Sequence, residues 1–323
     1  MEIGSYIELD LRNTGEYYPQ NTDIIRLNTA RAGIYHAIKV LGLTKVYIPY
    51  YLCSVVRDFL SARGLQVIYY SINENLEPDI AQNEIDTAFL LINYFGILTS
   101  KTIIKHTNHF HNVIIDNSQG FFSSPIEHCL NVYSPRKFFG VPDGCYVIGN
   151  NANLYSNLYS QDISSETSLF LLKRIEMGSQ KAYEDRMKNE NRLSRADVLI
   201  MSHLTKTLLK SIDYESIKNK RVNNFSYAHE KLRGLNKIKL NLTMDYQLFP
   251  MVYPLIIENE SLVEQLKSHG IYTGRWWSHV LRQVHPDSYE AYLSKYLIPI
   301  PIDQRYGPDE IDYIHKHIMR YVE

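Results

Sequence analysis

The sequence predicts an α/β fold, in which a mostly parallel central sheet is covered by helices and a smaller α+β domain follows at the C-terminal end. Two observations indicate this class. From about residue 27 to 150, short apolar runs rich in Val and Ile alternate with segments of helical periodicity, and consecutive apolar residues are typical of strands buried on both faces. After about residue 165 the chain becomes charged and poor in strand signals, and over the last hundred residues it changes again.

The strands of the first region are predicted from its apolar runs. These runs cover residues 45–49, 66–72, 87–93, 112–115, 129–133 and 145–148, and turn-forming residues bound them. Residues 31–41 repeat apolar side chains at helical spacing and stop at Gly42, which favours helix termination. Residues 54–62 and 103–110 predict two further helices of the same kind.

The second half of the chain predicts helices first and a small mixed domain afterwards. Residues 165–235 form a long, charged stretch with few strand signals, which is typical of two or three long helices. Residues 248–257 and 297–302 predict strands, and residues 261–269 and 308–321 predict helices. We therefore expect a large domain over residues 1–235 and a small α+β domain over residues 236–323.

Composition excludes several classes of partner. The 323 residues have a formal net charge of -1, so no overall field favours nucleic acid or an anionic membrane. The N-terminus lacks a basic start followed by an apolar core, and no apolar run reaches the roughly eighteen residues of a membrane span. Three scattered cysteines without a CxxC pair argue against disulfides and zinc. We expect a reduced cytoplasm, where the Asn-Leu-Thr at 241–243 is a chance glycosylation match.

Two segments place reactive side chains at strand ends. In VIIDNSQGF a strand runs directly into Asp116 and then Gln119, and carboxylates at such ends point into the crevice where open α/β sheets bind ligands. Alternatively, Asp116 caps the following turn. In LNVYSPRKFFGVPDGCYVIGN, Lys137 follows another strand within apolar and glycine-rich surroundings. Desolvation there lowers a lysine pKa and supplies the neutral amine that attacks an aldehyde, although most lysines are solvated surface charges.

Three blocks together resemble the DegT/StrS family of nucleotide-sugar aminotransferases, which have fold type I of the enzymes that use pyridoxal 5′-phosphate (PLP). They are NTARAGIYHAIKVLGL at 28–43, IIDNSQG at 114–120 and SPRKFFGVPDGCYVIG at 134–149. D-x-x-Q, a lysine and a G-x-x-[DE]-G turn are specific in combination. The resemblance is best over residues 27–150, loose over 180–200 and faint over 270–302. It implies PLP as the cofactor and no metal.

The resemblance implies roles for three residues. Lys137 would carry PLP as a Schiff base and later act as the base that moves a proton on the donor. Asp116 would keep the pyridine nitrogen protonated, so that the ring accepts electrons. Gln119 matches the residue that hydrogen-bonds the phenolic oxygen of the ring.

Thr29, Ala30 and Arg31 correspond to the Ser-Gly-Thr phosphate loop of the family. They begin a helix, where free amides and the helix dipole favour a dianionic phosphate. Thr29 would add a hydroxyl and Arg31 a charged fork, and Ala30 and Arg31 both depart from the family pattern. Alternatively, Thr29 is only a helix cap and Arg31 is solvated.

Further departures lie around the expected cofactor. Val132 stands where relatives carry a serine that binds the phosphate, and Ser134 is a candidate substitute. Cys53 stands where relatives cover the ring with an aromatic residue or histidine. Either Tyr50 or Tyr51 stacks on the ring instead, or this stacking contact is missing.

The sequence says less about the sugar. Asn93 and Tyr94 match a turn near the substrate of relatives, although Tyr94 is equally consistent with core packing. Asn189 and Arg192 lie where relatives have a segment that crosses into the site of the partner subunit, and for Arg192 a solvated helix face is the better interpretation. Arg275 begins the cluster RWWSH, which would stack a base or bind a carboxylate, although such tryptophans are more often core or interface residues.

The leading hypothesis is therefore a PLP-dependent aminotransferase. Glutamate would donate its amino group, and a keto group on a nucleotide-linked deoxysugar would accept it, for surface polysaccharide or glycoside biosynthesis. The resemblance also implies a homodimer with shared active sites. Three alternatives stay open: a PLP-dependent sugar dehydratase, in which a histidine replaces the lysine, a PLP-binding sensor or scaffold without turnover, and an α/β binding protein without cofactor.

Overall fold

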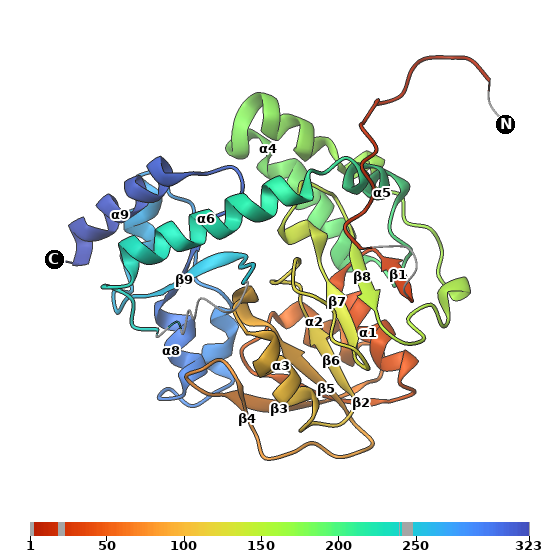
Figure 1. Ribbon diagram of the computed structural model, residues 1–323, viewed down its shortest axis with the longest axis horizontal. Coiled ribbons are helices and arrows are strands. Elements are labelled where there is room, and N and C mark those ends of the chain that lie inside the picture. The colour runs from red at the N-terminus through yellow and green to blue at the C-terminus, as the bar shows by residue number, and fades with distance from the viewer. Residues whose placement is uncertain (1–2, 19–22, 239, 241–247, 323) are drawn as a thin grey trace.

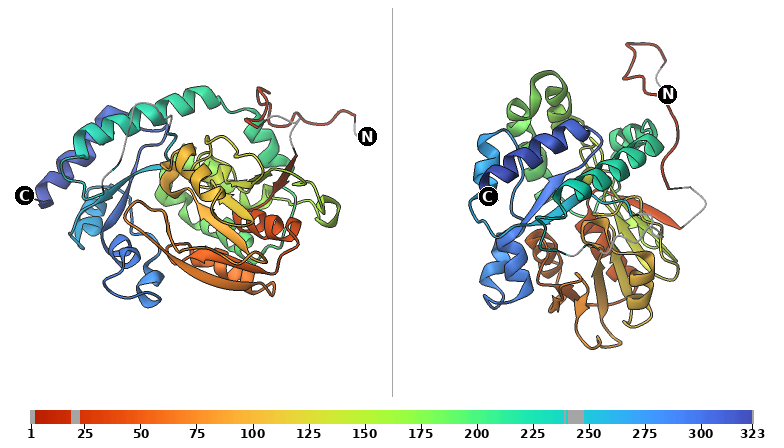
Figure 2. Two further views of the ribbon diagram at one scale, coloured as in Figure 1. Left: turned by 60° about the horizontal axis from the view of Figure 1, so that its bottom comes forward. Right: turned by 60° about the vertical axis from the view of Figure 1, so that its left-hand side comes forward.

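The computed structural model describes residues 3–18, 23–238, 240 and 248–322 (Figure 1). The Asn-Leu-Thr triplet at 241–243 lies outside these residues. Within them, residues 3–13 form an extended arm that projects from the body of the protein (Figures 1 and 2).

Among the described residues, eight strands form the central sheet in the order β1-β8-β7-β6-β5-β2-β3-β4. They are β1 (Ile24–Leu27), β2 (Lys45–Pro49), β3 (Gln66–Ile72), β4 (Pro78–Asp79), β5 (Ala88–Ile92), β6 (Val113–Asp116), β7 (Leu130–Tyr133) and β8 (Cys145–Ile148). The inner pairs from β7 to β3 are parallel, whereas β1, β8 and β4 pair antiparallel with their neighbours. The prediction of a mostly parallel sheet covered by helices is confirmed.

The helices follow the predicted pattern with a few differences. They are α1 (Ala30–Val40), α2 (Ser54–Ser61), α3 (Ser100–Thr107), α4 (Leu169–Arg195), α5 (His203–Lys210), α6 (Tyr214–Leu232), α7 (Leu262–Ser268), α8 (Tyr289–Tyr296) and α9 (Pro308–Val322). Helix α3 begins three residues before the predicted start, because the Thr99 side chain accepts from the amide of Thr102 and caps it. The short edge strand β1 and the tyrosine-rich helix α8 were not predicted.

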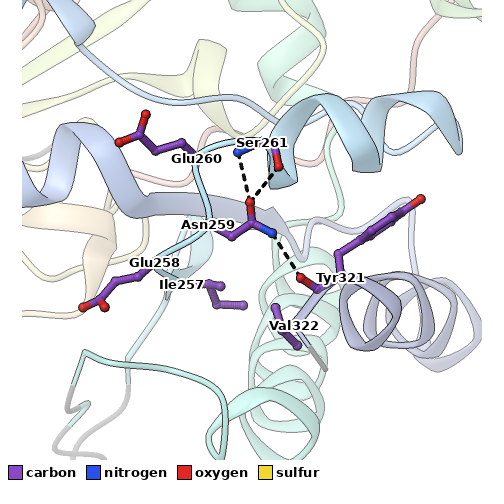
Figure 3. A pocket seen from close by; sticks show the side chains of 7 residues that line it. All are labelled: Ile257, Glu258, Asn259, Glu260, Ser261, Tyr321 and Val322. Atoms are coloured by element: carbon purple, nitrogen blue, oxygen red, sulfur yellow. Dashed lines mark hydrogen bonds between the residues drawn. The ribbon is translucent and has the colours of Figure 1, made fainter.

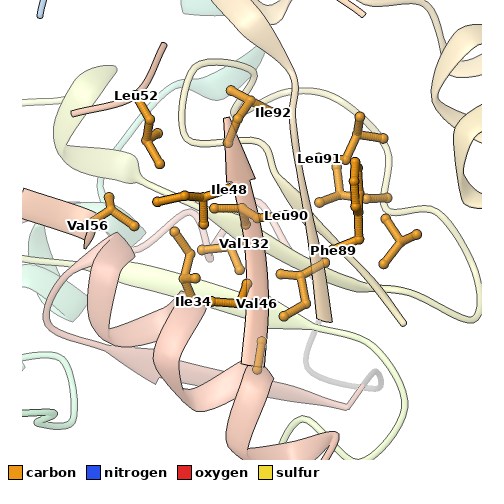
Figure 4. Close-up of a cluster of buried hydrophobic side chains, with 14 of the residues drawn as sticks. Ile34, Val46, Ile48, Leu52, Val56, Phe89, Leu90, Leu91, Ile92 and Val132 are labelled. Atoms are coloured by element: carbon orange, nitrogen blue, oxygen red, sulfur yellow. The ribbon is translucent and has the colours of Figure 1, made fainter. Parts of the chain in front are cut away.

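Helices α1 and α2 pack against the sheet through a continuous apolar core. Figure 4 shows Ile34 of α1 and Val56 of α2 among side chains of β2, β5 and β7. Gly33 lets α1 approach closely, because a Cβ atom there would lie 2.5 Å from the sulfur of Cys145 on β8. The beginning of α1 is therefore held on the sheet beside its central strands.

A second core lies between α6, α7, α9 and a two-stranded antiparallel sheet of β9 (Val252–Ile256) and β10 (Leu297–Pro301). The long helix α6 lies beside α9 (Figures 1 and 2). The α8 helix instead reaches the large sheet, where a Glu290 carboxylate oxygen accepts from the amide of Ile72 at 2.7 Å. The domain boundary at residue 235 stays a prediction, and α6 packs on elements that follow it. No helix in the described ranges combines the length and apolar character needed to cross a membrane.

Candidate functional site

The structure brings Asp116 and Lys137 to one edge of the central sheet. Asp116 is the last residue of β6, and Lys137 ends a short 3-10 helix, η2 (Pro135–Lys137), just after β7. Strands β6 and β7 are parallel, with Asp116 paired to Val132, so their carboxyl ends point the same way. This edge is where open α/β sheets place ligands.

The amine of Lys137 donates a hydrogen bond to the hydroxyl of Ser118 at 2.9 Å. The residue as a whole is exposed, yet protein atoms crowd around its amine, and the water that they displace lowers the pKa of Lys137. The carboxylate of Asp116 acts in the opposite direction and raises that pKa. Lys137 is thus more easily deprotonated than a surface lysine. Sequence reasoning missed Ser118, although it lies between the two residues singled out in D-x-x-Q.

Asp116 is only 4% exposed. One of its carboxylate oxygens accepts from the amide of Ser118 at 2.8 Å, so the turn-capping alternative is correct for that oxygen. The same carboxylate lies near enough to Lys137 to raise the pKa of that lysine. The two interpretations of Asp116 are therefore compatible.

Gln119 is buried, and its side-chain oxygen accepts from the amide of Phe95 at 2.9 Å. Phe95 lies in a second 3-10 helix, η1 (Tyr94–Gly96), which follows β5. Gly96 has a φ of +74°, and a Cβ atom there would lie 2.5 Å from the carbonyl oxygen of Gln119. Only glycine fits this contact. The turn fixes the Gln119 oxygen, and its amide nitrogen remains the group that can donate to a ligand.

The first turn of α1 supplies amides near this edge. Thr29 accepts from the amide of Ala32 at 3.3 Å, so the alternative interpretation of Thr29 as the helix cap is correct. Within the described residues, the amides of Ala30 and Arg31 form no hydrogen bond. Helix α1 therefore presents donors of the kind that bind a phosphate.

Arg31 is neither solvated nor directed at an open site. Its guanidinium donates to the carbonyl of Leu193 and lies 5.3 Å from the ring centroid of Phe59. Burial, followed by the charge of Arg136, lowers the pKa of Arg31. The alternative in which Arg31 is solvated is wrong, because its guanidinium is hydrogen-bonded to α4.

The expected neighbours of the cofactor ring divide into two groups. Cys53 is half-buried and immediately precedes α2. Ser134 is buried, and its carbonyl accepts from the amide of Lys137 at 3.3 Å. Tyr51, by contrast, is completely buried.

Tyr51 packs in an aromatic cluster, 4.6 Å between ring centroids from Trp277 and 5.8 Å from Tyr94. A fully enclosed ring has no face on which a cofactor can stack, so the structure contradicts that role for Tyr51. Tyr50 stacks on Tyr69 at 4.8 Å. Cys53 therefore remains a candidate neighbour of the ring.

Asn93 and Tyr94 support the turn rather than face a substrate. Asn93 donates to the side-chain oxygen of Asn117 at 2.9 Å and accepts from the amide of Leu98 at 3.2 Å. The Tyr94 hydroxyl donates to the carbonyl of Tyr51 at 2.7 Å. Both are buried, and the core interpretation of Tyr94 is correct.

Asn189 and Arg192 are also engaged within this chain. Asn189 is fully buried and donates to the carbonyl of Pro142 at 2.7 Å. Arg192 pairs with the carboxylate of Asp162 at 2.6 Å, so the expectation of a solvated face for Arg192 is wrong. The Asn189 contact anchors α4 to the turn that follows Lys137, and the Arg192 contact anchors it to the segment after β8.

Arg275 also makes internal contacts. Its guanidinium donates to the carbonyl of Asn259 at 2.7 Å, and burial lowers its pKa. The neighbouring Trp276 stacks on Phe95 with 5.6 Å between ring centroids. Arg275 and the two tryptophans of the RWWSH segment therefore pack within the protein, which agrees with the core interpretation of the tryptophans.

A cavity of about 620 Å³ lies in the small domain and is shown in Figure 3. It is lined by Ile257, Glu258, Asn259, Glu260, Ser261, Tyr321 and Val322. Its two glutamates repel a phosphate, and it contains no lysine, so it does not suit PLP. A smaller hollow adjoins Cys53, with Arg57, Tyr69 and His279 in its wall. Among the described residues, no group of three or more His, Cys, Asp or Glu could hold a metal ion.

No family model and no curated protein matches this sequence. Solved structures share its fold at low identity. The sugar aminotransferase CalS13 from Micromonospora echinospora has a TM-score of 0.66 and 15% identity, over 93% of this chain and 87% of that chain. A DegT DnrJ EryC1 StrS aminotransferase from Brucella abortus has a TM-score of 0.63 and 14% identity, over 93% and 86%. The PLP form of Spr1654 from Streptococcus pneumoniae has a TM-score of 0.63 and 12% identity, over 91% and 85%.

These similarities show the fold of this chain: it has the architecture of the sugar aminotransferases, which confirms the predicted fold type I class. Low identity extends over nearly the whole chain, so the likeness lies in the arrangement of elements. The chemistry of the site depends on the residues that this chain places there.

Proposed function

We propose that this protein is a PLP-dependent aminotransferase that moves an amino group, from glutamate, to a keto group of a nucleotide-linked sugar. The observation that carries the proposal is the pair of Lys137 and Asp116 at the ends of two adjacent parallel strands, with the pKa of the lysine lowered by its surroundings. The fold supports it, because solved neighbours with the same architecture are sugar aminotransferases, and Spr1654 occurs in PLP and PMP forms.

The residues of this site fit PLP. Bound there, the cofactor would supply an aldehyde that bonds to an amine and a ring that accepts electrons. Lys137 would bind it through its amine and, once released, move a proton at the donor carbon. The buried carboxylate of Asp116 would hold a proton on the ring nitrogen. The amides of Ala30 and Arg31 at the start of α1 would bind the phosphate, with the hydroxyl of Ser134 as a further candidate.

A second candidate, a protein that binds PLP as a sensor or scaffold, is favoured by the phosphate end of the site. Thr29 is engaged as a helix cap and Arg31 by the carbonyl of Leu193, so neither side chain is free for the phosphate. These contacts bear on affinity and leave the lysine unaffected. A sugar dehydratase is less consistent with the chain, because lysine stands where that class has histidine.

We further propose a homodimer with α4 at its interface. Helix α4 and its approach carry exposed apolar side chains, which are Ile163, Leu169, Leu172, Ile175, Met177, Tyr183 and Met187. Exposed apolar groups of this extent mark interaction surfaces. Ile175→Lys should convert dimers to monomers in sedimentation, and the equally drastic Ile85→Lys, on the loop before β5, should not. Monomers in both variants and in the wild type would contradict the dimer.

We also propose a cytoplasmic location. The three cysteines Cys53, Cys129 and Cys145 form no disulfide, which suits a reducing compartment. Fractionation of cells that produce the tagged protein would test this.

The test of the main proposal is an absorbance titration of the purified protein with PLP. We expect a visible band of lysine-bound PLP in the wild type and none in Lys137→Ala. Adding glutamate should convert the band to that of pyridoxamine phosphate and release 2-oxoglutarate. A band that ignores glutamate and other amino donors would favour the sensor. The absence of any band would contradict the whole proposal.

A further inference from the structure

A buried arginine of α6, the helix that packs on β9 and α9, contacts the residue that follows Lys137. Arg221 of α6 is 2% exposed, and its guanidinium carbon lies 4.5 Å from the ring centroid of Phe138. Its Nε donates to the side-chain oxygen of Gln304 at 3.0 Å, and its Nη1 donates to the carbonyl of Met251 at 3.1 Å.

Each of these two partners leads to a different part of the candidate site. Gln304 uses its amide nitrogen to donate to the carbonyl of Phe138 at 2.8 Å. Met251 donates through its backbone amide to the carbonyl of Phe95 at 2.8 Å. Phe95 in turn donates to the side-chain oxygen of Gln119. An unbroken series of hydrogen bonds thus runs from Gln119 through Arg221 to the backbone next to Lys137.

The guanidinium of Arg221 is well suited to hold this series together. Asp303 lies near enough to raise the pKa of Arg221, yet that carboxylate is paired with Arg305 at 2.7 Å. Burial lowers the pKa of Arg221 to about 10, so it remains charged at neutral pH. Burying a cation destabilises the folded protein unless its N–H groups find acceptors. The planar guanidinium also fixes the directions in which those acceptors must lie.

We propose that Arg221 is a positioning residue that sets Lys137 and Gln119 relative to each other, through Gln304 on one side and Met251 on the other. Its two acceptors belong to segments beside β9 and β10, so the geometry of the site depends on the small-domain elements being docked. The consequence for PLP binding rests on the proposed function, whereas the mechanical link does not.

The experiment compares Arg221→Met, Gln304→Glu and the exposed neighbour Lys220→Met as a matched control. Gln304→Glu keeps an acceptor for Arg221 and removes the donor to Phe138, so the protein should stay folded with the series interrupted. The first readout is backbone hydrogen exchange, in the protein without cofactor, of the peptides containing Phe95, Phe138 and Met251. The second is the dissociation constant for PLP.

The Phe138 amide donates to the carbonyl of Pro135, so its exchange reports opening of the turn whose carbonyl Gln304 binds. We expect this exchange to rise about threefold to tenfold in Gln304→Glu, because loss of one hydrogen bond favours opening by that factor, and PLP to bind more weakly by a similar factor. Arg221→Met should accelerate exchange at all three positions, and Lys220→Met at none. Wild-type exchange and affinity in a folded Gln304→Glu would overturn the proposal. Faster exchange in a protein whose wild type binds no PLP would retain the mechanical link and contradict the proposed function instead.

Discussion

Replacing Gly96 with alanine should destabilise the protein and loosen the candidate site together. Gly96 has a φ of +74°, which a residue with a Cβ atom adopts at a cost of about 1 kcal/mol. The added Cβ would lie 2.5 Å from the carbonyl oxygen of Gln119 and 3.0 Å from that of Phe249. Backbone atoms cannot rotate away, so overpacking adds roughly 1 to 3 kcal/mol.

Gly64 offers the matched control. It has a φ of +78°, and a Cβ atom there would meet nothing within 4 Å, so Gly64→Ala incurs only the backbone cost. Urea denaturation should show a loss of about 1 kcal/mol in the free energy of unfolding for Gly64→Ala and about 2 to 4 kcal/mol for Gly96→Ala. Only Gly96→Ala should also weaken PLP binding, because it displaces Gln119. Equal losses in both variants would refute the reasoning that close packing at Gly96 holds the site.

Two further predictions concern buried polar groups. The ring nitrogens of His36 contact the hydroxyl of Tyr159 at 2.9 Å and the carbonyl of Ala152 at 2.8 Å. Burial is the main cause that lowers the pKa of His36. The unfolded state therefore binds the proton more readily, and the free energy of unfolding should fall as the pH drops below about 6.5. Urea denaturation at pH 7.5 and 5.5 should show a smaller fall in His36→Gln than in the wild type. Arg192→Met should lower the free energy of unfolding in urea by about 2 kcal/mol, because it leaves the buried carboxylate of Asp162 unpaired. Lys45→Met, which removes an exposed ion pair, should lower it by less; similar losses in both variants would contradict the difference in burial.

The central strands and the two principal site residues were predictable because their signals are local. Consecutive apolar residues mark β2, β3 and β8 with the predicted bounds. Asp116 and Lys137 follow two such runs, and parallel neighbours must present their carboxyl ends at one edge. The same reasoning missed β1, whose four residues include Arg26, because a short edge strand carries little pattern of its own.

Side-chain partners could not be predicted when they lie far away in the sequence. Arg31 contacts Leu193, which is 162 residues distant, and Arg192 contacts Asp162 from another element. A stretch of sequence shows that an arginine is present, and it does not show which carbonyl or carboxylate the fold brings beside it. For each arginine, one interpretation of the sequence was a solvated side chain. In the structure, each one is bound to another part of the chain.

The sequence by itself determined the class of fold, the order of its elements and the positions of a lysine and a carboxylate at the strand ends, because hydrophobic period and turn chemistry act over a few residues. Only the tertiary structure decided that Tyr51 and Asn93 are enclosed, that Ser118 receives the amine of Lys137, and that Arg221 joins the small-domain side to the site. Burial and hydrogen bonding between distant segments depend on how whole layers pack, and that packing is set by the entire chain at once.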